Sequence, residues 1–115
     1  MIVLIEDDEA IRDVFNLSLR AWFKVVVFEN SELILSNKAD VPDVFVLDKN
    51  ISGISGIDLC RFIKSSERYK HVPTYLLSAA PDIANAAQAA GADGFIEKPF
   101  SIKSLRELML KAGSC

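Results

Sequence analysis

Five short runs of apolar residues, many of them β-branched, recur along this chain of 115 residues and constrain its fold more than any other feature. Each run is almost entirely apolar, without the alternation of polar residues that marks a half-exposed strand. This pattern is typical of strands buried on both faces of a sheet. The runs occupy residues 2–5, 24–28, 44–47, 74–77 and 94–96. We therefore predict five interior strands.

Segments with helical spacing of apolar residues follow each run. Asp8 is placed to cap the first helix, whose apolar positions continue to Trp22, a residue predicted to lie in the core. The fourth helix should cover 83–90 and stop at Gly91 in a left-handed cap, and the fifth should begin after Ser101. The alternation predicts a (βα)5 α/β fold: a doubly wound, five-stranded parallel sheet of the flavodoxin-like kind. In such sheets ligands bind beyond the carboxyl ends of the strands.

The length suits one domain, residues 1–115, with no room for an output domain. The net charge of −3 comes without a basic cluster, which argues against direct nucleic-acid binding. No apolar run approaches the roughly 20 residues needed to span a membrane. The two isolated cysteines indicate a reducing compartment, so we expect a cytoplasmic protein. Met1 directly before the first strand suits a natural start, whereas the other end fits a whole protein or a domain of a larger one.

The usual cofactor and hydrolase motifs are missing from the sequence. One histidine and two isolated cysteines cannot build a His/Cys metal cage. The sequence also contains no glycine-rich phosphate loop and no G-x-S-x-G motif. We expect His71 on the surface and Cys60 as a small buried hydrophobe.

Polar residues stand directly after several of the apolar runs, where the predicted topology brings strand ends together. Glu6 and Asp7 follow the first run, Asp48 the third, Ser78 the fourth, and Lys98 comes shortly after the fifth. Two carboxylates about 4 Å apart repel by roughly 4 kcal/mol at an effective dielectric of 20. Three carboxylates facing one lysine therefore indicate either a raised pKa or a bound cation. Oxygen-only ligands favour Mg²⁺, or else Mn²⁺, over Zn²⁺.

A cation site with a carboxylate, a hydroxyl and an ammonium group suits phosphoryl transfer. The Asp48 carboxylate could attack phosphorus and form an aspartyl phosphate. The metal and Lys98 would offset charge on the phosphoryl oxygens, and the Ser78 hydroxyl could donate a hydrogen bond to one of them.

Four segments, in order, make the chain resemble the receiver domain of two-component response regulators, of the stand-alone kind similar to chemotaxis regulators. The resemblance covers nearly the whole sequence. The matching segments are Val3-Leu4-Ile5-Glu6-Asp7-Asp8, Val46-Leu47-Asp48 with Gly56 behind it, Leu76-Leu77-Ser78-Ala79, and Gly91-Ala92-Asp93-Gly94-Phe95-Ile96-Glu97-Lys98-Pro99-Phe100. Each segment alone is a weak signal, but all four at the ends of the correct strands are highly specific.

The resemblance implies a role for each matching residue. Asp48 would be the phosphoacceptor, Ser78 the switch hydroxyl, Phe95 the aromatic switch and Lys98 the phosphate contact, with a cis Lys98–Pro99 bond. Glu6, Asp7, Asp48 and the backbone carbonyl of Asn50 would form the magnesium site, Glu6 through water.

Some positions depart from the family pattern. Ser52 replaces a common proline, which suggests a less rigid loop. Ala80 offers no polar group to orient an attacking water, which suggests a persistent phosphorylated state. Phe95 lacks a tyrosine hydroxyl, and we expect the extra cation, Lys49, to be solvated.

The leading hypothesis is a signalling switch that catalyses only its own phosphorylation and dephosphorylation. The resemblance implies a sensor histidine kinase or phosphotransfer protein as donor. It also implies an output partner on the face of the fourth helix, fifth strand and fifth helix, and allows a phosphorylation-dependent homodimer. One alternative is a constitutive interaction module with a vestigial acidic pocket. Another is a magnesium-dependent phosphohydrolase, although the D-x-D motif expected of such enzymes is absent. A flavodoxin-like binder is disfavoured because the acids would repel a flavin phosphate.

Overall fold

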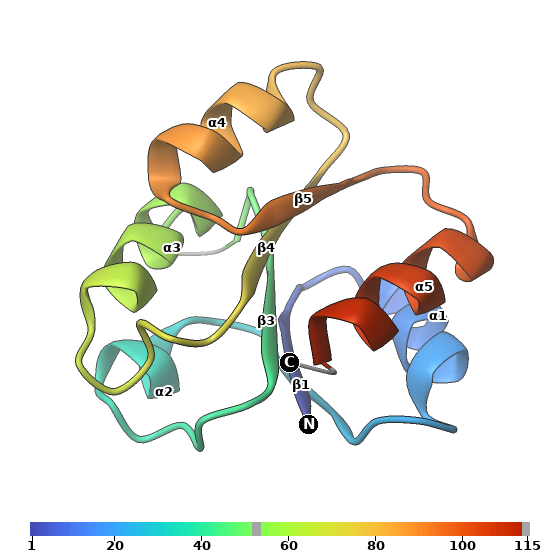
Figure 1. Cartoon of the computed structure of the whole chain (residues 1–115), viewed down its shortest axis with the longest axis horizontal. Helices are drawn as coiled ribbons and strands as arrows, with labels where there is room; N and C mark the ends of the chain where they lie inside the picture. Colours follow the sequence, from blue (N-terminus) through green and yellow to red (C-terminus); the bar gives the residue numbers. More distant parts are fainter. Residues whose placement is uncertain (52–53, 114–115) are drawn as a thin grey trace.

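One parallel sheet organises the molecule, as predicted. The computed structural model describes residues 1–51 and 54–113, and in this part of the chain five strands pair in the order β2-β1-β3-β4-β5 (Figure 1). Their bounds are β1 (Ile2–Ile5), β2 (Val25–Phe28), β3 (Val44–Asp48), β4 (Thr74–Ser78) and β5 (Gly94–Glu97). Ser52, whose effect on loop rigidity was predicted above, lies outside the described residues.

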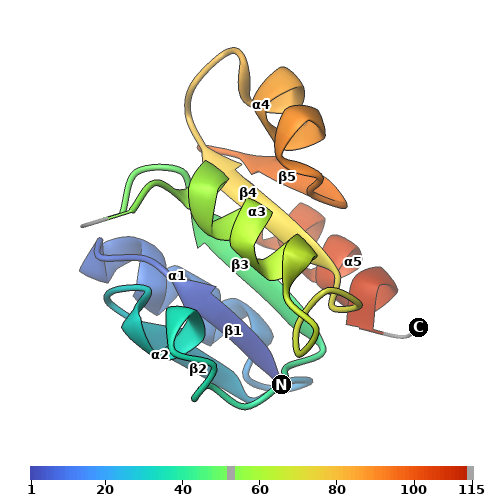
Figure 2. The same cartoon turned by 90° about the vertical axis from the view of Figure 1, so that its left-hand side faces the viewer.

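Helices cover both faces of the sheet. Their bounds are α1 (Glu9–Leu19), α2 (Glu32–Leu35), α3 (Gly56–Ser65), α4 (Ile83–Ala90) and α5 (Ile102–Gly113). Helices α1 and α5 lie on one side of the sheet, and α2, α3 and α4 lie on the other (Figures 1 and 2). The predicted doubly wound α/β fold is therefore confirmed.

Each face of the sheet has its own hydrophobic core. On β1, Val3 and Ile5 pack in the core beneath α2, α3 and α4, whereas Ile2 and Leu4 pack in the core beneath α1 and α5. Successive strand side chains point to opposite faces, so an entirely apolar strand supplies both cores at once. This explains why the runs in the sequence lack polar alternation.

The helix boundaries follow local chemistry. The Asp8 side chain accepts a hydrogen bond from the Ile11 N–H at 3.2 Å and caps α1 as predicted. Gly91 ends α4 with φ of 80°, a left-handed conformation that glycine adopts without steric cost. At α5, the Ser101 hydroxyl accepts a hydrogen bond from the Ser104 N–H at 3.0 Å.

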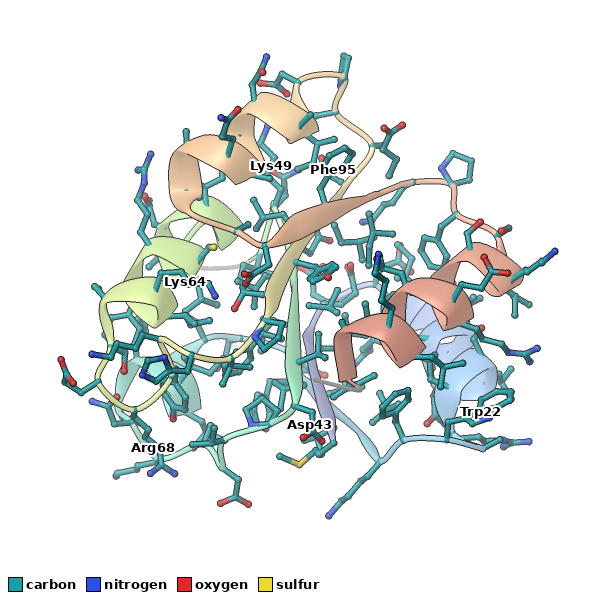
Figure 3. All side chains as sticks on the ribbon, in the orientation of Figure 1. Trp22, Asp43, Lys49, Lys64, Arg68 and Phe95 are labelled. Atoms are coloured by element: carbon teal, nitrogen blue, oxygen red, sulfur yellow. The ribbon has the colours of Figure 1, made fainter. Side chains whose placement is uncertain are left out.

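The prediction that Trp22 lies in the core is wrong. Helix α1 ends at Leu19, and the Trp22 side chain is 51% exposed at the outer end of α1 (Figure 3). The Arg106 guanidinium of α5 lies 4.9 Å from the centre of the indole ring. The ring is thus partnered by a cation at the surface, while about half of the residue remains exposed.

Three further structural expectations are confirmed. His71 is exposed, Cys60 is buried, and the Lys98–Pro99 peptide bond is cis. Burial raises the pKa of the Cys60 thiol to about 11. In the described residues, no helix is long and apolar enough to cross a membrane.

Candidate functional site

Three acidic side chains meet at the carboxyl edge of the sheet, where β1 and β3 end next to each other. The register pairs Ile5 with Leu47, so Glu6 and Asp48 follow side by side. The structure brings together one carboxylate oxygen each of Glu6, Asp7 and Asp48, all within 4.8 Å of one another. Glu6 and Asp48 are buried, at 1% and 5% exposure, whereas Asp7 is exposed. The predicted acidic cluster is therefore present.

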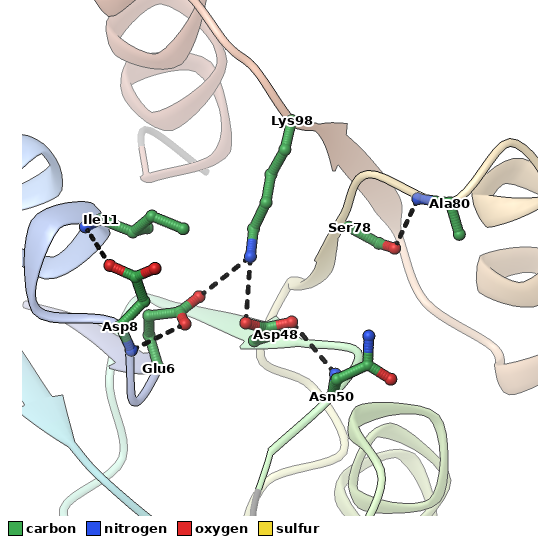
Figure 4. Close-up of polar contacts among 8 residues, drawn as sticks. All are labelled: Glu6, Asp8, Ile11, Asp48, Asn50, Ser78, Ala80 and Lys98. Carbon is green, nitrogen blue, oxygen red and sulfur yellow. Dashed lines mark hydrogen bonds and ion pairs between the residues drawn. The ribbon is translucent and has the colours of Figure 1, made fainter.

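Lys98, which follows β5, lies between two of these acids. Its Nζ donates a hydrogen bond to Asp48 Oδ2 at 3.1 Å and makes a longer contact of 3.5 Å with Glu6 Oε2 (Figure 4). Burial alone would lower the pKa of Lys98, but the hydrogen bond and charge of Asp48, together with Glu6, raise it above its ordinary value. The lysine therefore stays charged and offsets part of the negative charge at the site.

One lysine does not neutralise three carboxylates, and the pKa of Glu6 is raised. Burial is the largest cause that raises the pKa of Glu6 to about 7, and its hydrogen bond and charge interaction with Asp48 add to the effect. The Asp8 N–H donates to Glu6 Oε1 at 3.1 Å and opposes the shift, as does Lys98. Near neutral pH this buried acid is thus divided between its protonated and ionised forms.

Hydrogen bonds from the backbone and from Lys98 hold the Asp48 carboxylate in place. The Asn50 N–H donates to Asp48 Oδ1 at 3.0 Å, while Lys98 occupies Oδ2. Behind the strand end, a Cβ on Gly56 would lie 2.1 Å from the Asp48 carbonyl oxygen. Only glycine permits this approach, which brings the start of α3 against the backbone of the acidic residue.

Ser78 and Phe95 lie on the neighbouring strands β4 and β5. The Ser78 hydroxyl is buried at the end of β4 and accepts a hydrogen bond from the Ala80 N–H at 3.0 Å, within its own loop (Figure 4). Phe95 on β5 is 36% exposed and lines a surface hollow of about 350 Å³ with Pro99 and Phe100. The Ser78 hydroxyl is therefore bonded within its own loop, and Phe95 lies beside open space.

Sequence reasoning missed one charged contact beside the site. Lys49 was expected to be solvated, but its side chain is only 22% exposed and its Nζ lies 3.5 Å from Asp82 Oδ1, so that expectation is wrong. The two residues are 33 positions apart, and no motif in the sequence connects them.

The residues present suit a hard divalent cation. Three carboxylates supply oxygen ligands, which Mg²⁺ prefers, and an exposed Asp7 leaves room for the waters that Mg²⁺ retains.

A family comparison agrees with this arrangement. Residues 2–110 match the model of the response regulator receiver domain, which spans the strand ends described above. The chain belongs to the response regulator receiver family. Receiver domains are signalling modules rather than conventional enzymes.

Individual relatives extend the comparison. The receiver domain is 31% identical over 108 residues to the phosphate regulon transcriptional regulatory protein PhoB of Rhizobium meliloti, covering 90% of this chain and 48% of PhoB. A response regulator structure from Chloroflexus aurantiacus matches with a TM-score of 0.90 at 26% identity, covering 99% of this chain and 97% of that one.

A third similar structure is the receiver domain of the sensor histidine kinase PA1611 from Pseudomonas aeruginosa, described with a magnesium ion coordinated in its active-site cleft. It matches with a TM-score of 0.86 at 24% identity, covering 99% of this chain and 97% of that one. The receiver domain spans about half the length of the curated relatives it matches.

Proposed function

We propose that this receiver domain is a phosphoacceptor switch in a two-component phosphorelay, with Asp48 as the residue that is phosphorylated. The observation that carries the proposal is the setting of Asp48. Its carboxylate lies at the end of β3, is held by the Asn50 N–H and Lys98, and faces two further acids. A sensor histidine kinase or a phosphotransfer protein would be the donor.

The chemistry is a transfer between two nucleophiles. An oxygen of the Asp48 carboxylate attacks phosphorus, an O–P bond forms, and the N–P bond of the donor phosphohistidine breaks with its electron pair returning to the imidazole nitrogen. Lys98 contacts Asp48 Oδ2 and is placed to stabilise charge on the phosphoryl oxygens. The domain would promote only its own phosphorylation and its own dephosphorylation, in which water attacks phosphorus and the Asp48 carboxylate leaves.

Glu6, Asp7, Asp48 and the backbone carbonyl of Asn50 would hold a magnesium ion, or manganese in its place. When bound, the ion supplies positive charge next to the transferring group. The acidic cluster supports this assignment, as does the magnesium site of the PA1611 receiver domain, which shares the fold. Asp7, being exposed, is the better candidate for direct contact, with Glu6 acting through water.

Output would follow from movement of Ser78 and Phe95. The Ser78 hydroxyl would leave the Ala80 N–H and donate to a phosphoryl oxygen, and Phe95 would turn toward the vacated space. The face formed by α4, β5 and α5 would then change its preference for an output protein or a second copy of the chain. Residues 1–115 would form a single receiver domain, and the domain would act in the cytoplasm.

The direct test is incubation with Mg²⁺ and acetyl phosphate, followed by intact-mass spectrometry. We expect the wild type to gain one phosphoryl group, Asp48→Ala to gain none, and the matched surface variant Asp13→Ala to behave like the wild type. An undiminished mass gain in Asp48→Ala would refute the assignment of the acceptor.

The same samples separate the alternatives. A vestigial pocket predicts no mass gain and no response of amide chemical shifts to Mg²⁺. A phosphohydrolase predicts continuous release of phosphate from a generic phosphate ester, beyond one turnover per chain.

A further inference from the structure

The Lys49–Asp82 ion pair joins the phosphoacceptor strand to the start of α4. Lys49 immediately follows Asp48, and Asp82 is the residue just before α4. The Lys49 ammonium lies 3.5 Å from Asp82 Oδ1. Figure 3 shows Lys49 on the α4 side of the molecule, near the end of β4. The contact therefore connects two neighbouring loops at the carboxyl edge of the sheet.

The backbone of Lys49 is fixed on both sides. Its N–H donates to the Leu77 carbonyl of β4 at 3.0 Å, and its carbonyl accepts from the Gly56 N–H at 2.8 Å. The ammonium group thus extends from the same anchored backbone that carries Asp48. A new charge on the Asp48 side chain would act on this cation with little freedom for the backbone to move away.

Asp82 is an N-cap residue whose capping capacity is unused. In α1 and α3, the Asp8 and Ser55 side chains accept hydrogen bonds from N–H groups of the first turn. Asp82 makes no such bond within the described residues, and its φ of −93° and ψ of 12° differ from the extended conformation that a capping residue usually adopts. Since aspartate is among the best N-caps, α4 begins without a stabilising contact that its own sequence could provide.

We propose that Lys49 is a positioning residue that determines whether Asp82 caps α4. In the unmodified domain Lys49 holds the Asp82 carboxylate away from the helix. Phosphorylation replaces the single negative charge of the Asp48 carboxylate with a phosphoryl group of about −1.5 to −2, a net gain of about one half to one negative charge on the residue before Lys49, which draws the ammonium toward the phosphoryl oxygens. The released carboxylate then caps the first turn of α4. The release of Asp82 by phosphorylation rests on the proposed function, whereas the contact between Lys49 and Asp82 does not.

The weakness of the pair suits an exchange between two partners. Asp82 is 66% exposed at its side chain, and an exposed ion pair stabilises a protein by an amount similar to that of a weak N-cap, so a modest change in charge can decide between the two. A strong, buried pair would resist release. Phosphorylation at Asp48 would in this way reach the α4 end of the output face through the side chains of Lys49 and Asp82.

The test uses hydrogen exchange at the amides of Ala84 and Asn85, the second and third residues of α4. In the unmodified chain, Lys49→Met should slow this exchange about fivefold, the usual effect of gaining an N-cap. Lys49→Arg should retain wild-type exchange, because it keeps the ion pair. The double variant Lys49→Met with Asp82→Ala should lose the slowing.

Lys70→Met is the matched control, since it removes a lysine that pairs with Glu67 away from the site. It should leave α4 exchange unchanged. Equal exchange in Lys49→Met and the wild type would overturn the proposal, as would a slowing that persists in the double variant.

Phosphorylated samples test the trigger separately. The wild type should show the fivefold slowing on phosphorylation, and Lys49→Met should show no further change. If no mass gain occurs, the proposed function fails while the comparison of unmodified variants still decides the role of Lys49. If both proteins are phosphorylated and slow equally, the link through Lys49 is refuted.

Discussion

Replacing Glu6 by glutamine should change how the stability of the metal-free domain depends on pH. Glu6 is 1% exposed, and its pKa is raised from 4.5 to about 7, first by burial and then by Asp48. Because the folded state holds its proton more tightly than the unfolded state, this group stabilises the fold at low pH. Its contribution is lost as pH rises toward the folded-state pKa near 7.

The magnitude follows from the two pKa values. The complete shift corresponds to about 3 kcal/mol, at about 1.4 kcal/mol per pKa unit. Between pH 5.5 and 8 the linkage relation leaves a change of about 2 kcal/mol, since the unfolded-state carboxyl is already ionised over this range. We subtract the free energy of unfolding of Glu6→Gln from that of the wild type. This difference should therefore fall by about 2 kcal/mol from pH 5.5 to pH 8.

Urea unfolding in EDTA, followed by circular dichroism, measures this difference. Glu107→Gln, which removes an exposed acid on α5, is the control and should differ from the wild type by a constant amount. A difference between wild type and Glu6→Gln that is the same at both pH values would refute the reasoning.

Magnesium provides a second readout of the same group. If only the ionised form of Glu6 admits the cation, the apparent dissociation constant should be about thirtyfold weaker at pH 5.5 than at pH 8. In Glu6→Gln the pH dependence over this range should be much reduced. Titration calorimetry at the two pH values measures both constants.

Three further substitutions test the structure around the site and the core. Gly56→Ala should destabilise the domain by about 3 kcal/mol in urea unfolding, because its Cβ would lie 2.1 Å from the Asp48 carbonyl oxygen; full stability would contradict the close approach. Lys98→Met should slow acetyl-phosphate labelling of Asp48 at least tenfold, since it removes the cation 3.1 Å from Oδ2; wild-type labelling kinetics would exclude that role. Tyr69→Phe should cost about 1 kcal/mol in thermal or urea unfolding, because the buried hydroxyl donates to the Ala39 carbonyl at 2.8 Å, and an unchanged midpoint would argue against that bond.

The fold and the acidic site could be predicted because both follow from where apolar runs end. In a parallel sheet, uninterrupted apolar runs specify the strands, and the next residue of each strand lies at the same edge. The register that pairs Ile5 with Leu47 makes Glu6 and Asp48 neighbours without any further information. The prediction needed only strand boundaries correct to about one residue.

Contacts between distant side chains could not be obtained this way. The helical period continued to Trp22, but the backbone turned after Leu19, and the cation that covers the indole ring lies 84 positions later at Arg106. The pairing of Lys49 with Asp82 likewise depends on how the loops after β3 and β4 approach each other. Neither a helical period nor a strand-end rule contains that information.

The acidic site works against the stability of the fold that positions it. Entirely apolar strands drive two cores together, and the same strands place Glu6 and Asp48 next to each other at an edge with 1% and 5% exposure. Lys98 neutralises part of that charge, while burial and then Asp48 raise the pKa of Glu6 to about 7. A bound cation would relieve the repulsion between the carboxylates. A phosphoryl group on Asp48 would add negative charge and so increase the need for a cation. Because Glu6 and Asp48 are buried next to each other, a change of charge at either one alters the electrostatic energy of the whole site, which is how a modification there would act as a signal.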